Sequence, residues 1–157
     1  MRTIDTLLIE YGKSHQNRIN KIIHWIMVPA IFFSIVGLVM SIPLGTIEKT
    51  MFINVATVAL ILSLVYYFSL SKPLFVGFCV WSVFCLWGNF VIYQSVDYSN
   101  SGLATVSFIT FFIAWIFQFI GHKIEKAKPS FFDDIKFLLI GPAWLLHFIY
   151  KKLGIKY

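Results

Sequence analysis

The sequence predicts an all-α, polytopic membrane bundle of four transmembrane helices, with an amphipathic helix before them and a short interfacial or re-entrant helix after them. Two observations predict this fold. Of the 157 residues, 59% are hydrophobic and only 13% are charged, and a soluble domain of this length cannot keep so many apolar side chains from water. The apolar residues also gather into uncharged stretches of the length that crosses a bilayer.

The N-terminal segment predicts the amphipathic helix. Ile4, Leu7, Leu8 and Tyr11 follow the i, i+3, i+4, i+7 spacing that places side chains on one face of a helix. We expect this helix to lie on the membrane surface with its apolar face toward the lipid.

Four transmembrane helices are expected in the middle of the chain, over residues 22–42, 52–70, 74–93 and 103–121. Each stretch has roughly the 20 residues that a helix needs to cross the hydrocarbon layer. Helices are expected because lipid offers no hydrogen-bond partner to an open backbone. The polar connections are short, so residues 1–157 should form a single membrane-embedded domain.

The last apolar run, residues 137–150, is short for a span and contains Gly141 and Pro142. We therefore expect an interfacial or re-entrant helix there. A polar link precedes it and includes Lys126, Lys128, Pro129, Asp133 and Asp134.

The basic residues predict how the bundle is oriented. Four crossings put both chain ends on one side, which then holds all of the 13 lysines and arginines except Lys49. Positive loops face the cytoplasm, so both termini are expected to be cytoplasmic. The membrane would be the endoplasmic reticulum in a eukaryote and the inner membrane in a bacterium. The basic residues flank apolar runs, which indicates contact with lipid headgroups and not with nucleic acid.

The chain has four histidines, His15, His24, His122 and His147, and this topology brings all four to the cytoplasmic boundary. Such a gathering predicts a metal site. His15 and His24 are nine residues apart and would face opposite ways on one continuous helix. The chain must therefore bend between them, and residues 16–18 are the expected corner.

Each of three histidines has a polar residue one helical turn before it, which could hold its second ring nitrogen. The pairs are Tyr11 with His15, Asn20 with His24, and Gln118 with His122. Glu125 lies one turn after His122 and could be a ligand or an outer partner. An imidazole-rich set suits iron, zinc or copper. Cys79 and Cys85 lie within one apolar run without metal-site spacing and are expected to be buried thiols.

Two motifs resemble the signatures of the Mpo1-like family. The first is Tyr11-x3-His15-x-Asn17-x2-Asn20-x3-His24-x4-Pro29, and the second is Trp115-x2-Gln118-Phe119-x-Gly121-His122-x2-Glu125-x3-Pro129. Gly141-Pro142 resembles a third, weaker signature. The resemblance runs from about Tyr11 to Pro142.

The resemblance implies an iron(II)-dependent dioxygenase that performs α-oxidation: a 2-hydroxy fatty acid and O2 give the acid one carbon shorter, CO2 and water. It implies a role in the degradation of lipids and sphingoid bases. His15, His24 and His122 would then be catalytic metal ligands, with His147 as a fourth ligand. The outer-partner or substrate-binding residues would be Tyr11, Asn17, Asn20, Gln118 and Glu125.

Three other functions remain open from the residues alone. Two axial histidines could bind haem in an electron carrier. A small transporter or lipid-organising protein would need no metal, although the spans lack the mid-membrane charges that coupled transporters use. A zinc-dependent lipid hydrolase could use the same imidazoles. The sequence leaves open the number of metal ions, the acyl chain length and the oligomeric state.

Overall fold

The computed structural model describes residues 3–125 and 138–156. Within these residues the chain forms six α-helices and no strand, which confirms the all-α prediction. The helices are α1 (Thr3–Lys13), α2 (Arg18–Met40), α3 (Val55–Leu70), α4 (Lys72–Ser95), α5 (Asn100–Ile124) and α7 (Ile140–Lys152). The polar link predicted at residues 126–134 lies outside the described residues.

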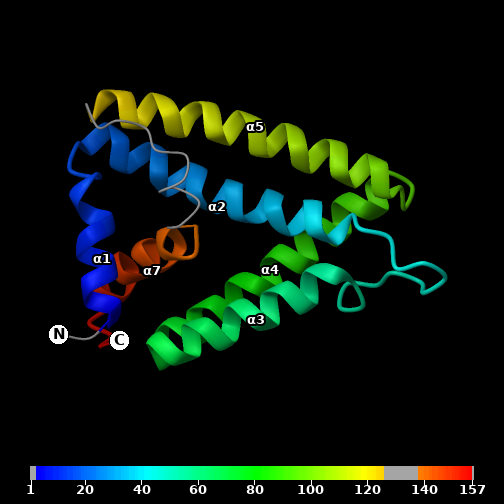
Figure 1. Ribbon diagram of the computed structural model, residues 1–157, viewed down its shortest axis with the longest axis horizontal. Helices are drawn as coiled ribbons and strands as arrows, with labels where there is room; N and C mark the ends of the chain where they lie inside the picture. Colours follow the sequence, from blue (N-terminus) through cyan, green and yellow to red (C-terminus); the bar gives the residue numbers. More distant parts are fainter. Residues whose placement is uncertain (1–2, 126–137, 157) are drawn as a thin grey trace.

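The helices form two long antiparallel pairs with a smaller pair between them (Figure 1). α2 packs against α5, α3 packs against α4, and α2 also contacts α4. The long pairs lie close at the end that holds loops 41–54 and 96–99 and spread apart toward the other end (Figure 1). There α1 and α7 pack against each other. α1 begins and α7 ends at this wide end of the bundle.

Three helices are long and apolar enough to cross a membrane: α2, α4 and α5, with 23, 24 and 25 residues. α3 has 16 residues and begins at Val55, later than predicted, because the Asn54 side chain accepts a hydrogen bond from the Thr57 N–H at 3.0 Å and caps the helix there. At 1.5 Å per residue α3 is about 24 Å long. It is therefore shorter than the span of about 20 residues expected for that stretch.

α4 and α5 extend beyond both ends of the apolar stretches that predicted them, and α2 begins four residues before its stretch. Lys72 and Pro73, expected in a connection, form the first turn of α4 after the N-cap Ser71. Proline fits there because the first turn needs no hydrogen bond from its backbone nitrogen. For the same reason Pro142 lies in the first turn of α7 and does not interrupt it.

The apolar face of α1 is used inside the protein. Ile4, Leu8 and Tyr11 are buried, and α1 packs on α7. The face that was expected to meet lipid therefore packs against α7 instead.

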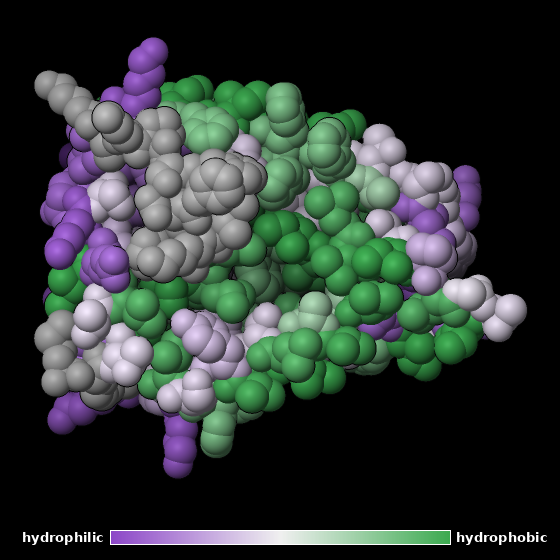
Figure 2. Space-filling view, in the orientation of Figure 1, coloured by the Kyte–Doolittle hydropathy of each residue, from purple (hydrophilic) through white to green (hydrophobic). Residues whose placement is uncertain are grey.

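The surface is divided into zones along the long axis. Hydrophobic side chains cover the middle of the molecule, and hydrophilic ones gather at the wide end, with a smaller group at the opposite end (Figure 2). Large apolar side chains on the outer faces are exposed, such as Leu62 at 67% and Phe108 at 59%. Lys49, the basic residue predicted for the opposite side, donates hydrogen bonds to the Met40 carbonyl and to Asn100 Oδ1 at that end. This surface suits a protein whose middle is surrounded by lipid.

Candidate metal centre

Three histidines from three segments meet at the wide end of the bundle. His15 lies in the corner after α1, His24 in the first part of α2, and His122 in the last turn of α5. Their ring centroids are 4.1 Å apart for His15 and His24, 5.0 Å for His24 and His122, and 5.5 Å for His15 and His122. One nitrogen from each ring lies within 4.8 Å of the others. All three side chains are at most 4% exposed, so the cluster is shielded from water.

Hydrogen bonds fix the orientation of two of the rings. The Nδ1 atom of His15 lies 2.6 Å from the Tyr11 carbonyl, and that of His24 lies 2.9 Å from the Asn20 carbonyl. A carbonyl only accepts, so Nδ1 is the donor in both rings. In a neutral imidazole the lone pair is then on Nε2, which is the arrangement of metal-binding histidines.

The residues expected to hold these rings do so in an unexpected way. Tyr11 and Asn20 are the predicted positions, but their backbone carbonyls accept the hydrogen bonds and their side chains have other contacts. The Tyr11 ring stacks on His15 with centroids 4.3 Å apart. Trp144 of α7 lies 5.4 Å from the His15 ring. Trp144 was not predicted because nothing distinguished it within the last apolar run.

The corner between α1 and α2 falls at residues 14–17 and overlaps the bend predicted at residues 16–18. Asn17, expected as an outer partner, is the N-cap of α2: its Oδ1 accepts a hydrogen bond from the Ile19 N–H at 2.8 Å. The bend turns His15 back toward His24, which a continuous helix would not allow.

Glu125 connects this corner to the end of α5. Its carboxylate accepts hydrogen bonds from the Gln16 N–H at 2.7 Å, the Asn17 N–H at 2.8 Å and Asn20 Nδ2 at 2.9 Å. Burial of the Glu125 carboxyl raises its pKa, but the hydrogen bonds and the His15 charge outweigh burial and hold the pKa below its ordinary value of 4.5. The group is thus an ionised acceptor at neutral pH. It binds the corner and is not a member of the histidine cluster.

Gly121 lets α5 approach the corner. A Cβ at this position would collide with Asn20 Oδ1 and would lie 3.5 Å from Ile23. Asn20 has little freedom to move away, because it is fully buried and its Nδ2 also donates to the Ser14 carbonyl at 3.2 Å. The glycine before His122 therefore sets the distance between α5 and the other two histidines.

Substitution of Gly121 by alanine should push α5 away from α2 and destabilise the fold. Overpacking of this kind costs about 1–3 kcal/mol, which thermal unfolding of the purified protein would measure. Gly12→Ala is the matched control, because a Cβ there meets Trp144 Nε1 at an ordinary 3.6 Å. Equal melting temperatures for the two variants would contradict the close approach.

His147 lies outside the cluster that the sequence predicted it to join. α7 runs antiparallel to α1: its Gly141 lies beside Tyr11, whereas His147 lines a separate pocket with Asp5 and Leu8. His147 is therefore one turn too far along α7 to meet the other rings. Burial and the Lys151 charge lower the pKa of His147, against the raising effect of Asp5.

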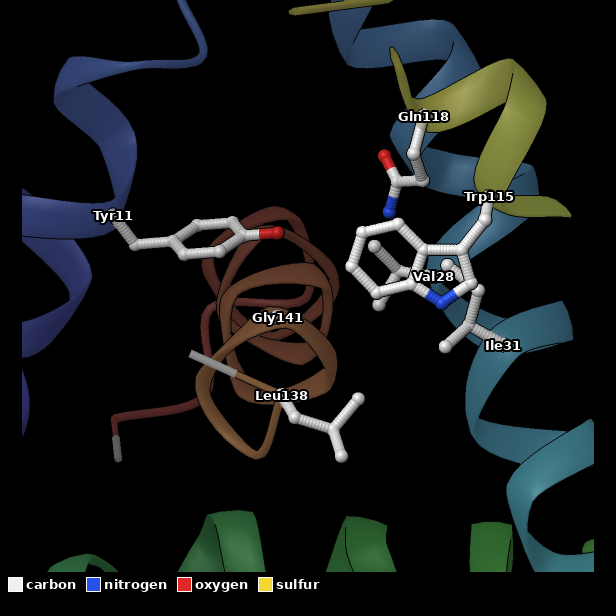
Figure 3. Close-up of a pocket in the computed structure, with 7 residues that line it drawn as sticks. All are labelled: Tyr11, Val28, Ile31, Trp115, Gln118, Leu138 and Gly141. Atoms are coloured by element: carbon white, nitrogen blue, oxygen red, sulfur yellow. The ribbon is translucent and has the colours of Figure 1, made fainter. Parts of the chain in front are cut away.

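A cavity of about 30 Å³ lies one helical turn from the clustered histidines, toward the middle of the bundle, and is called the cavity below the histidines. Tyr11, Val28 and Gln118 line it (Figure 3), each one helical turn from a clustered histidine. The Tyr11 hydroxyl and the Gln118 amide extend into it (Figure 3). Gln118 is 7% exposed, and its Oε1 has no hydrogen-bond partner among residues 3–125 and 138–156. The cavity has room for a water-sized molecule or a small polar group.

Comparison with known proteins shows the family to which the chain belongs. The family model described as 2-hydroxy-palmitic acid dioxygenase Mpo1-like matches residues 1–153. The chain belongs to the Mpo1-like family. A relative from Saccharomyces cerevisiae, 2-hydroxy-palmitic acid dioxygenase MPO1, is 31% identical over 149 residues, which are 92% of this chain and 78% of the relative. No solved structure matches the chain significantly.

Most of the Mpo1-like motif residues now have a physical explanation. The histidines of the two motifs form the cluster. The residues between them shape it: Asn17 caps α2, Asn20 and Glu125 bind the corner, and Gly121 allows the helices to approach. The last motif position, Pro129, lies outside the described residues.

Proposed function

We propose that this Mpo1-like protein is an iron(II)-dependent dioxygenase that shortens 2-hydroxy fatty acids by one carbon. The observation that supports it most is the cluster of three buried imidazoles, with ligand nitrogens within 4.8 Å of one another. The family description and the name of the yeast relative point to an oxygenase acting on a 2-hydroxy acid.

The donor set fits a redox-active metal. His15, His24 and His122 would hold the ion through neutral imidazole nitrogens, which suit iron, copper and zinc. Zinc has no redox chemistry, so an oxygenase reaction favours iron. Bound iron supplies the activation of O2, which does not otherwise react readily with a 2-hydroxy acid. No thiolate lies in the cluster, and both cysteines are free thiols on α4.

The reaction balances without a further cofactor. A 2-hydroxy acid, R–CH(OH)–COOH, and O2 give R–COOH, CO2 and water; the bond between C1 and C2 breaks. The substrate loses four electrons, and O2 accepts the same four, so neither a nicotinamide nor a flavin is needed.

The residues around the cluster would bind and orient the substrate. The Gln118 amide, one turn below His122, can donate to a carboxylate or accept from the 2-hydroxyl group. The Tyr11 hydroxyl extends toward the same cavity (Figure 3). Burial of the cluster excludes water and strengthens these polar contacts.

We also propose that α3 is the fourth membrane span, reached with local thinning of the bilayer or with its polar flanking residues at the interface. Both termini and the histidine cluster then face the cytoplasm. The membrane is the endoplasmic reticulum in a eukaryote or the inner membrane in a bacterium.

The proposal is tested by assaying protein loaded anaerobically with iron(II) against 2-hydroxypalmitate in detergent. The expected result is one CO2 and one shortened acid for each O2 consumed, with no turnover of palmitate as the control. Loading with zinc should give no O2 consumption. Turnover of an ester by the zinc-loaded protein, with none of the hydroxy acid by the iron-loaded protein, would favour a hydrolase instead.

A further inference from the structure

A second, apolar cavity lies between α2 and α3 and shares the lining residue Leu138 with the cavity below the histidines. This second cavity has a volume of about 110 Å³. Phe32, Ile35 and Val39 line it from α2, and Ala56, Ala59 and Ser63 line it from α3. We call this second cavity the α2–α3 groove. We infer that it holds the acyl chain of the substrate, an assignment that rests on the proposed function.

Two features connect the groove to the histidine cluster. Leu138 lines both the groove and the cavity below the histidines. On α2, His24, Val28, Ile31 and Ile35 follow the i, i+4, i+7, i+11 spacing of one helix face. A molecule with its polar end at His24 would therefore follow a single face of α2 into the groove. From His24 to Val39 this path is about 22 Å long at 1.5 Å per residue.

The lining of the groove suits an alkyl chain. All the lining side chains are apolar except Ser63, and its hydroxyl donates to the Ala59 carbonyl at 3.0 Å. The lining side chains thus offer an occupant no free hydrogen-bond donor. A hollow among hydrophobic side chains is visible between α2 and the α3–α4 pair in Figure 2.

A larger apolar cavity of about 160 Å³ lies between α2, α4 and α7. Its residues include Trp25, Pro29, Trp81 and Leu146, and it shares no residue with the cavity below the histidines. Trp25 and Pro29 are on the neighbouring face of α2, about 100–140° from His24. Connection to the cluster therefore favours the α2–α3 groove over this larger cavity.

The test measures kcat/KM over a series of 2-hydroxy acids of increasing length for Ala59→Phe and Ser63→Phe. Each methylene that the groove no longer buries should lower kcat/KM about fourfold. α3 ends at the histidine side of the molecule (Figure 1), so Ser63 lies nearer to the histidines than Ala59 does. The chain length above which kcat/KM falls should therefore be shorter for Ser63→Phe than for Ala59→Phe. Leu62→Phe, on the same helix but 67% exposed, is the matched control and should keep the wild-type profile.

A second readout does not depend on turnover. A 2-hydroxy acid with a diazirine at its methyl end is bound to metal-free protein and photolysed, and the labelled peptide is identified by mass spectrometry. We expect the label within α3. Labels on Trp81 or Leu146, together with a changed chain-length profile in Leu146→Phe alone, would overturn the inference. Labelling of α3 without turnover of any acid would contradict the proposed function and leave the groove assignment supported.

Discussion

Substitution of His24 or His122 by alanine should abolish O2-dependent release of CO2 from a 2-hydroxy acid, with kcat lowered by at least about 100-fold. Loss of a partner that only orients a ligand already costs about 10–100-fold in metal affinity or activity. Each of these rings supplies a nitrogen to the three-histidine cluster, so its removal should cost more. The measurement is O2 uptake with 2-hydroxypalmitate.

His147→Ala is the matched control for these variants, because His147 lines a different pocket. Its activity and metal content should match those of the wild type, because His147 supplies no nitrogen to the three-histidine cluster. Loss of activity equal to that of His24→Ala would restore the four-histidine site that the sequence predicted. Full activity in His24→Ala would contradict the metal centre.

Substitution of Glu125 by alanine should have an intermediate effect, since Glu125 positions the histidines without joining them. The variant loses the hydrogen bonds from Gln16, Asn17 and Asn20, and the corner that holds His15 becomes free to move. We expect metal affinity to fall about 10–100-fold. Isothermal titration with iron(II) under anaerobic conditions would measure it.

Two comparisons define the role of Glu125. Glu48→Ala removes an exposed carboxylate from the loop at the opposite end of the bundle and should leave the iron affinity unchanged. Glu125→Gln keeps the shape of the side chain and should recover part of the affinity. Complete loss of metal in Glu125→Gln would identify the carboxylate as a ligand, whereas unchanged affinity in Glu125→Ala would show that the corner is held by other contacts.

Much of the site could be predicted because the membrane topology and the spacing of residues along a helix can both be read directly from the sequence. The apolar stretches predicted the α2, α4 and α5 spans, and counting crossings put His15, His24 and His122 at one level of the bundle. Helical geometry required a bend between His15 and His24, and the chain bends there. The i, i+4 spacing also identified Tyr11 and Asn20, whose carbonyls accept hydrogen bonds from His15 and His24.

The remaining features depend on contacts between distant segments, which spacing does not reveal. From the sequence, Glu125 could equally be a metal ligand or an outer partner. Only its position beside the corner shows that its carboxylate accepts hydrogen bonds from backbone N–H groups. The direction of α7 relative to α1 decides that Trp144, and not His147, meets His15. The start of α3 depends on a single cap by Asn54, which an apolar run cannot indicate.

The most direct test of the metal centre is elemental analysis of protein purified without oxygen, in wild type and in His122→Ala. We expect about one iron per chain in the wild type, held by the single three-histidine cluster of the described residues, and almost none in the variant. Wild-type protein that contains no metal, or that is fully active with zinc alone, would contradict the proposed iron centre.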